Sequence, residues 1–212
     1  MKYKVVIFDL DGTLLDTLED LAAAVNHAMR EKGFALHTPD EYRRMVGHGV
    51  RNLVTQALPE EERSERQIDE SLDAFKKYYT SHIDIHTRPY PGMQELLRSL
   101  DKEGVRMAVA SNKFQSGTEY LIQRFFADIP FVAILGNRDG FPLKPDPEIV
   151  AEVLRMADIP KDEAVLVGDS PTDMKTAANG GIRAVAVSWG YRDMPEEITV
   201  GSVEELAAQL LE

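Results

Sequence analysis

The sequence predicts an α/β fold, in which a doubly wound, Rossmann-like parallel sheet forms the core and an all-helical cap domain is inserted after the first strand. From about residue 85 onward, short apolar runs alternate with segments of helical periodicity, which is typical of a parallel sheet covered by helices on both faces. Between about residues 16 and 84 the apolar spacing indicates helices only. We therefore expect a core of residues 1–15 and 85–212 and a cap of residues 16–84.

The first strand is predicted at residues 5–8, a continuous apolar run typical of a strand that is buried on both faces. In the cap, apolar residues recur at helical spacing over residues 18–29, 50–57 and 68–79. A further helix is expected to begin at Thr38-Pro39-Asp40-Glu41, because threonine, proline and glutamate occupy the positions of a capping box.

The remaining core elements alternate regularly. Helices are expected over residues 93–103, 118–125 and 172–178. Another helix is expected to follow the loop of residues 144–147 and to end at about residue 157. Strands are expected over residues 105–110, 131–135, 164–167 and 182–187. Ser202-Val203-Glu204-Glu205 predicts a capping box at the start of the last helix.

Composition excludes several classes of protein. The 212 residues include no cysteine, which rules out a disulfide scaffold and a thiolate metal site. A net charge of −12 disfavours nucleic-acid binding. The apolar run before Asp9 is too short for a signal peptide or a membrane span, so we expect a cytoplasmic protein without a membrane partner. Either a monomer or a homodimer is compatible with these features.

Polar side chains follow three of the predicted strands. Ligands of open parallel sheets bind outside the carboxyl ends of the strands, so these polar groups are expected to meet in one crevice. They are Asp9 and Asp11 after the first strand, Ser111 and Asn112 after the second, and Asp169 and Asp173 after a later one.

Several aspartates in one crevice repel one another, and a divalent cation removes that repulsion. Because the available ligands are oxygens, Mg²⁺ is favoured over Zn²⁺. A carboxylate that is not needed for the metal can act as a nucleophile on phosphorus, and a second one can serve as the acid and base. Ser111 can donate to a phosphoryl oxygen, and Lys144 can neutralise its charge.

Four segments resemble, in the same order, the motifs of the haloacid dehalogenase superfamily of phosphotransferases. They are Phe8-Asp9-Leu10-Asp11-Gly12-Thr13-Leu14, Ser111-Asn112-Lys113, Lys144-Pro145, and Gly168-Asp169-Ser170 with Asp173. The resemblance spans nearly the whole chain, and it implies that the helical insertion is a cap that closes over the crevice.

The resemblance also implies roles for single residues. Asp9 is expected to be the nucleophile that forms an aspartyl-phosphate and contacts the metal. Asp11 is expected to be the general acid and base, with its backbone carbonyl on the metal. Phosphate is expected to bind Ser111, the Asn112 backbone and Lys144. Asp169 is expected to bind the metal, and Asp173 to support the site or its outer ligands.

Within the superfamily, the chain most resembles the phosphoglycolate phosphatases, on the cap segment 42–49 and on Ser188-Trp189-Gly190-Tyr191-Arg192. This implies Mg²⁺-dependent hydrolysis of a small-metabolite phosphate ester, with 2-phosphoglycolate as the expected substrate. His48 departs from the small polar residue that is frequent in that group. His48 or Arg51 is the expected partner of a substrate carboxylate.

Two alternative functions stay open at this stage. A sugar-phosphate mutase or a pyrophosphatase of the same superfamily would use the same motifs. A phospho-accepting receiver module of signalling also uses an aspartate, a hydroxyl and a lysine on a doubly wound sheet. Receiver modules, however, are uninterrupted and carry the acceptor on an interior strand, whereas here a long helical block follows the first strand.

Overall fold

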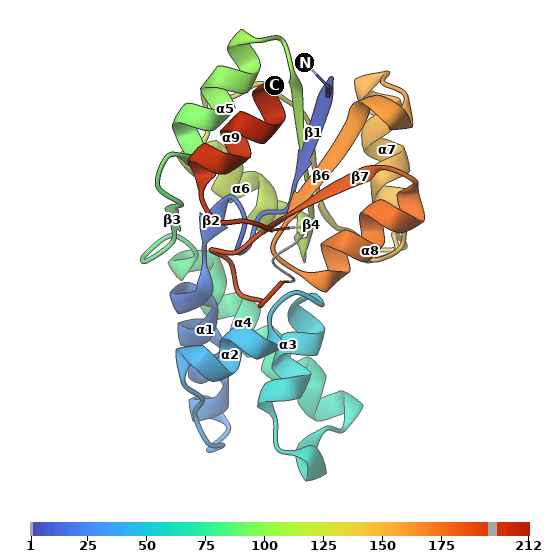
Figure 1. Cartoon of the computed structure of the whole chain (residues 1–212). Coiled ribbons are helices and arrows are strands. Elements are labelled where there is room, and N and C mark those ends of the chain that lie inside the picture. The colour runs from blue at the N-terminus through green and yellow to red at the C-terminus, as the bar shows by residue number, and fades with distance from the viewer. Residues whose placement is uncertain (1, 195–198) are drawn as a thin grey trace.

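A six-stranded sheet forms the centre of the computed structural model, which describes residues 2–194 and 199–212 (Figure 1). The strands lie in the order β5-β4-β1-β6-β7-β8, and all neighbouring pairs are parallel. Their bounds are β1 Val5–Phe8, β4 Arg106–Phe114, β5 Phe131–Asn137, β6 Ala164–Gly168, β7 Arg183–Val187 and β8 Thr199–Val200. The first strand therefore lies between β4 and β6, and the predicted doubly wound core is confirmed.

Helices cover both faces of this sheet (Figure 1). On one face lie α5 Met93–Lys102, α6 Gln115–Phe125 and α9 Val203–Leu211; on the other lie α7 Glu148–Ala157 and α8 Pro171–Gly180. Successive side chains of β1 alternate between the two layers: Val6 and Phe8 join the first apolar cluster, whereas Val5 and Ile7 join the second. Burial on both faces explains why β1 is an uninterrupted apolar run.

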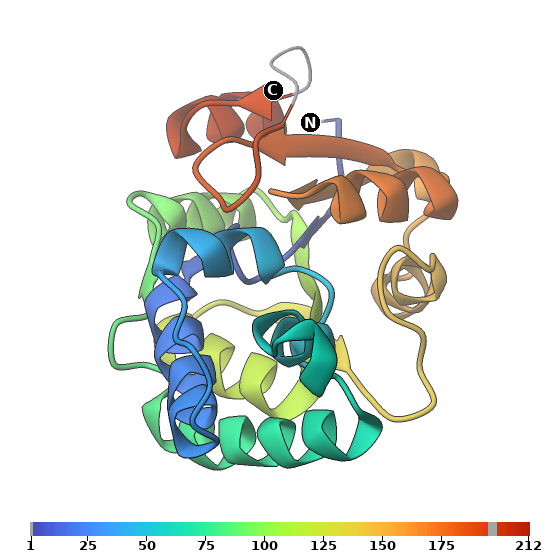
Figure 2. The same cartoon turned by 90° about the horizontal axis from the view of Figure 1, so that it is seen from below.

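The helical block lies against the carboxyl end of the sheet (Figures 1 and 2). It consists of α1 Leu18–Glu31, α2 Pro39–Met45, α3 Val50–Ala57, the 3₁₀ turn η1 Glu60–Glu62 and α4 Glu65–His82. Its apolar side chains belong to the same cluster as one face of the sheet. The division into a core and a cap at residues 15/16 and 84/85 therefore stays a prediction, because packing is continuous between them.

A two-stranded antiparallel ribbon joins the block to the sheet, and the sequence did not predict it. Strand β2 Leu15–Asp16 pairs with β3 Arg88–Pro89, so that the chain leaves the core and returns to it side by side. Asp20 on α1 fastens the returning chain, because its buried carboxylate accepts hydrogen bonds from the backbone of His86 and from the backbone and hydroxyl of Thr87 at 2.8–3.0 Å.

The two predicted capping boxes have different outcomes. At α2 the box is complete: the Glu41 backbone donates to Thr38 Oγ1 at 3.3 Å, and the Thr38 backbone donates to Glu41 Oε2 at 2.7 Å. At α9 half of it is wrong. The Glu205 backbone does donate to the Ser202 hydroxyl, but the Glu205 carboxylate accepts from the backbone of Gly201 at 2.6 Å.

Strand β4 is longer than the sequence predicted. It continues past Ala110 through residues 111–114, with a shift of register against β5 between Ala110 and Phe114. Ser111, Asn112 and Lys113 therefore lie in the irregular end of a strand and not in a loop after it.

Candidate active site

The carboxylates of Asp9 and Asp169 lie beside each other because their strands are neighbours. Asp9 directly follows β1 and Asp169 directly follows β6, and the Asp9 backbone donates to the Val167 carbonyl at 2.9 Å. Oxygens of Asp9, Asp169 and Asp173 all lie within 4.8 Å of one another, and the three residues are buried. The structure thus brings together the acidic groups that the sequence placed at the ends of two strands.

Two glycines make room for the Asp169 carboxylate. A Cβ atom on Gly12, whose φ is 86°, or on Gly190 would overlap the side chain of Asp169. Both backbones can approach this closely only because glycine has no side chain, and the positive φ of Gly12 also favours glycine. The loop after β1 and the loop after β7 are thereby held against the end of β6.

Lys144 is the cation inside this acidic cluster. Its buried ammonium lies 3.0 Å from Asp9 Oδ1 and 2.7 Å from Asp173 Oδ1. Burial lowers the pKa of Lys144, but the two carboxylates outweigh it, so its pKa lies above the usual value and the group stays charged. The other oxygen of Asp173 accepts from the backbone and hydroxyl of Ser170. Both Asp173 oxygens are therefore engaged within the protein.

When ionised, the carboxyl groups of Asp9, Asp169 and Asp173 carry more negative charge than the single ammonium of Lys144 can offset. Burial raises the pKa of Asp9 to about 8, although Lys144 lowers it, and burial together with Asp173 raises the pKa of Asp169 to about 7. Asp9 Oδ1 already accepts from the Leu10 backbone at 2.7 Å and from Lys144. Hard oxygen ligands at this spacing fit Mg²⁺, and a divalent cation would remove the repulsion that raises these pKa values.

Asp11 lies at the edge of the cluster and is held by two side chains. Thr17 Oγ1 donates to Asp11 Oδ1 at 2.7 Å, and the Lys113 ammonium lies 3.1 and 3.4 Å from the two carboxylate oxygens. Lys113 is buried and also contacts the hydroxyl of Tyr79 on α4 at 2.7 Å. We did not single out Lys113 or Tyr79 from the sequence, although Lys113 stands in the second motif; only the fold shows that Tyr79 reaches it.

The side chains of Ser111 and Asn112 have different hydrogen-bond partners. Ser111 lines the crevice, and its hydroxyl oxygen accepts from the Lys113 backbone at 3.3 Å. The Asn112 amide donates to the carbonyls of Gly47 and Lys144 at 3.1 Å, and its oxygen accepts from the Lys144 backbone at 2.8 Å. The Asn112 side chain therefore fixes the Lys144 loop and the cap segment, and only its backbone is left for a phosphate.

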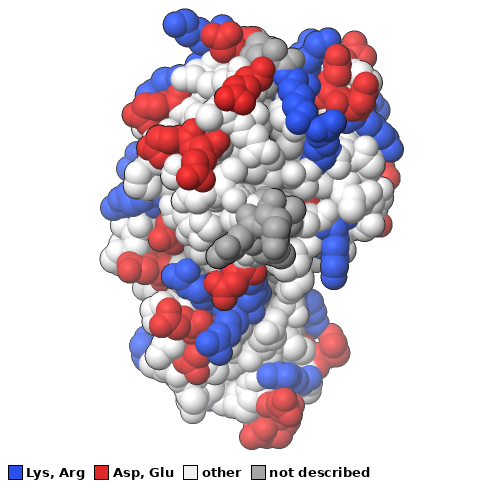
Figure 3. All heavy atoms as spheres, in the orientation of Figure 1, with Lys and Arg blue, Asp and Glu red and all other residues white. Residues whose placement is uncertain are grey.

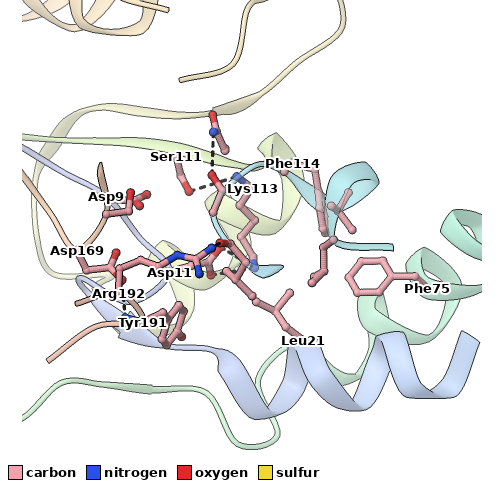
Figure 4. Close-up of a pocket in the computed structure, with 17 residues that line it drawn as sticks. Asp9, Asp11, Leu21, Phe75, Ser111, Lys113, Phe114, Asp169, Tyr191 and Arg192 are labelled. Atoms are coloured by element: carbon pink, nitrogen blue, oxygen red, sulfur yellow. Dashed lines mark hydrogen bonds and ion pairs between the residues drawn. The ribbon is translucent and has the colours of Figure 1, made fainter. Parts of the chain in front are cut away.

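The crevice opens into a hollow between the sheet and the helical block (Figure 4). Carboxylates form its floor, and the opposite wall is apolar. Leu21, Val50, Leu53, Phe75 and Phe114 make up this wall, and four of the five come from α1, α3 and α4. The helices of the predicted cap thus contribute most of this apolar wall.

The two predicted specificity residues, His48 and Arg51, are not among the described residues that line this hollow. The Arg51 guanidinium pairs with Glu65 and Asp69 at the start of α4, on an exposed surface. His48 is exposed and lines a separate hollow beside α8. Arg192, which we did not single out, does line the main hollow.

Tyr191, which follows Gly190, connects the acidic cluster to the ribbon. Its backbone donates to Asp169 Oδ2 at 2.6 Å, and its hydroxyl accepts from the Thr17 backbone at 2.7 Å. Thr17 in turn holds Asp11. The loop after β7 therefore orders both the Asp169 carboxylate and the start of α1.

One face of the surface carries side chains of both charges. Basic and acidic side chains are interspersed on the face shown in Figure 3, with basic groups also near the junction of the sheet and the helical block. The overall charge of −12 is screened over about 8–10 Å, so local cations decide how an anion is received. Over the described residues, no helix is both long and apolar enough to cross a lipid bilayer.

Comparison with known proteins agrees with this geometry. The model of the haloacid dehalogenase-like hydrolase family matches residues 6–187. A phosphoglycolate phosphatase of Mesorhizobium japonicum is 37% identical over 195 residues, covering 91% of this chain and 86% of that protein. One of Pseudomonas fluorescens is 35% identical over 211 residues, covering 97% and 78%. A solved structure from Lactobacillus delbrueckii subsp. bulgaricus, described as a candidate phosphoglycolate phosphatase, superposes with a TM-score of 0.92 at 33% identity over 99% of both chains.

The chain therefore belongs to the haloacid dehalogenase-like hydrolase family. This confirms the family and the enzyme class that the four motifs predicted: the protein is a hydrolase, and the relatives that it matches over most of their length are phosphoric monoester hydrolases by name. The receiver-module alternative does not fit, because α1–α4 interrupt the sheet directly after β1.

The crowded carboxylates give the first testable prediction. Without a divalent cation, the free energy of unfolding should fall as the pH rises from about 6 to about 8. In this window the folded chain still holds protons on Asp9 and Asp169, whereas ordinary carboxyl groups of the unfolded chain, with a pKa near ~4, have lost them. The contribution of these two groups to the free energy of unfolding is therefore fully present below about pH 4, and it is lost as the pH rises through their pKa values of about 7 and about 8.

Urea unfolding between pH 5 and 9, with a chelator and with Mg²⁺, measures this effect. Mg²⁺ should stabilise the protein more at pH 8 than at pH 6, and Asp169→Asn should show a shallower pH slope in the chelator. If the free energy of unfolding has the same pH slope in the variant and the wild type, and Mg²⁺ does not stabilise the protein, the buried carboxyl groups do not repel one another as the raised pKa values imply.

Proposed function

We propose that the protein is a Mg²⁺-dependent phosphatase that hydrolyses 2-phosphoglycolate through an aspartyl-phosphate on Asp9. The observation that carries this proposal is that Asp9 lines the floor of the hollow beside the Lys144 ammonium, with Asp11 two residues away and held by its own partners. The names of the matched relatives support the choice of substrate.

In the first step, the free carboxylate oxygen of Asp9 attacks phosphorus. Asp9 Oδ1 contacts the Leu10 backbone and Lys144, and we assign the attack to the other oxygen, Oδ2. The new Asp9–phosphorus bond replaces the bond to the ester oxygen. Asp11 protonates that leaving oxygen, while Lys144 and the Ser111 hydroxyl offset charge on the phosphoryl group.

In the second step, the aspartyl-phosphate is hydrolysed. Asp11, now ionised, takes a proton from a water molecule, whose oxygen attacks phosphorus and releases the carboxylate of Asp9. The products are orthophosphate and glycolate, and Asp11 is protonated again for the next cycle. The apolar wall contributed by α1, α3 and α4 limits the access of other water molecules to the phosphorylated aspartate.

The acidic floor supplies the metal ligands of the proposal. Asp9 and Asp169 are its carboxylate ligands, with the backbone carbonyl of Asp11, while Asp173 supports the site through Lys144 and Ser170. When bound, Mg²⁺ would offset the negative charge shared by the carboxylates and the substrate phosphate.

Release of phosphate from a panel of esters tests the proposal. The panel contains 2-phosphoglycolate, several sugar phosphates and pyrophosphate, each with Mg²⁺ and with a chelator. We expect Mg²⁺-dependent release, with 2-phosphoglycolate preferred by kcat/KM. Preference for pyrophosphate, or transfer of the phosphoryl group to a sugar hydroxyl instead of water, would replace the proposal by the pyrophosphatase or mutase alternative.

Lys113 gives a second prediction about this mechanism. Lys113→Met removes the cation that holds Asp11, so protonation of the leaving oxygen becomes inefficient. We expect kcat/KM for 2-phosphoglycolate to fall about 100-fold, the lower range of general acid catalysis. The value for p-nitrophenyl phosphate, whose leaving group needs no proton, should fall far less.

Two further variants separate positioning from structure. Lys113→Arg keeps a cation at this place and should recover part of the activity toward 2-phosphoglycolate. Tyr79→Phe removes the hydroxyl contact but leaves the lysine, so its effect should be smaller than that of Lys113→Met. If Lys113→Met lowers kcat/KM equally for both esters, Lys113 does not act through Asp11.

A further inference from the structure

The cations around the hollow differ in how many hydrogen-bond donors they have left. Lys144 is engaged by Asp9 and Asp173, and Lys113 by Asp11 and Tyr79. Among the described residues that line the hollow, Arg192 is the cation with donors to spare. Its guanidinium carries five N–H groups, and one of them, on Nη2, donates to the Val46 carbonyl at 2.7 Å.

Arg192 is held in place from both sides of the hollow. It directly follows Tyr191, whose backbone is fixed on Asp169, and its own tip is fixed on the cap segment between α2 and α3. The side chain lies beside Asp169 and extends toward Asp11 in the close-up of the hollow (Figure 4). A guanidinium that is anchored at both ends loses little freedom when it binds a ligand.

We propose that Arg192 is the subsite for a carboxylate on the leaving group of the substrate, an inference that rests on the proposed phosphatase function. A phosphate ester whose alcohol carries a carboxylate brings a second negative charge into a hollow that already has Asp9, Asp11 and Asp169 on its floor. That charge needs a cation whose donors are free, and the planar guanidinium matches a carboxylate with two parallel hydrogen bonds.

The same subsite discriminates against neutral esters. An ester without the carboxylate leaves the half-buried guanidinium facing an apolar group, and its lost hydration is then not replaced. Of the two residues that the sequence suggested for this role, His48 lines a separate hollow. The other, Arg51, already pairs with Glu65 and Asp69 on the outside of the helical block. Arg192 therefore replaces both residues as the expected determinant of specificity.

A matched pair of substrates tests this assignment. 2-Phosphoglycolate and ethyl phosphate have the same ester group and chain length, and differ in the terminal carboxylate. In Arg192→Met, we expect kcat/KM for 2-phosphoglycolate to fall about 10- to 100-fold more than kcat/KM for ethyl phosphate, as loss of a charged hydrogen-bond pair predicts. Loss of the bond to Val46 affects both esters alike, so it cancels in the ratio.

Binding gives a second readout that does not depend on turnover. In an Asp9→Asn background with Mg²⁺, calorimetry should show that Arg192→Met weakens binding of 2-phosphoglycolate about 10-fold or more but leaves the Kd of orthophosphate within about twofold. Arg192→Lys should lie between the wild type and Arg192→Met. Arg51→Met is the matched control, and unfolding midpoints verify that each variant is folded.

The outcomes separate this inference from the proposed function. If the wild type prefers 2-phosphoglycolate over ethyl phosphate and Arg192→Met keeps the preference, the carboxylate subsite is wrong and the phosphatase function stands. If Arg51→Met abolishes the preference instead, the subsite lies on the cap. If the wild type shows no preference between the two esters, both the choice of 2-phosphoglycolate and the subsite are wrong.

Discussion

The electrostatic balance of a few buried carboxylates is the constraint on which the rest of the site depends. Asp9, Asp169 and Asp173 have oxygens within 4.8 Å of one another at the edge of the sheet, and one buried ammonium, that of Lys144, lies among them. Such an arrangement costs free energy unless a cation is bound. The glycines at positions 12 and 190, the capping of α8 by Ser170 and the backbone of Tyr191 all hold this cluster in place.

The proposed acid–base group, Asp11, and the proposed specificity group, Arg192, are linked to the helical block and not to the sheet alone. Asp11 is reached by Lys113, which contacts Tyr79 on α4, and Arg192 is tied to the segment between α2 and α3. The proposed nucleophile, Asp9, and its neighbour Lys144 are, in contrast, held by groups of the core. In the proposed mechanism, the core supplies phosphoryl transfer and the helical block determines which leaving group fits, consistent with the frequent separation of scaffold and specificity in enzymes.

The parts of the structure that the sequence could predict follow from simple periodicity. An apolar run such as residues 5–8 must be buried, parallel strands end at one edge, and Asp9 and Asp169 therefore had to meet. Two-residue strands such as β2 and β8 have no periodicity to detect. Lys113 and Tyr79 are 34 positions apart, so only the fold shows that they are in contact. Both Arg192 and Arg51 are arginines in or next to a predicted motif, and only the fold shows which of the two side chains lines the hollow.

Trapping of the covalent intermediate tests whether Asp9 is the nucleophile. The enzyme is mixed with excess 2-phosphoglycolate and Mg²⁺, quenched in acid within milliseconds, digested and analysed by mass spectrometry. We expect one phosphoryl group on the peptide that contains Asp9, and we expect it to disappear once the substrate is exhausted. Turnover of the ester with no phosphorylated peptide at any quench time, or with the phosphoryl group on another residue, would contradict this assignment.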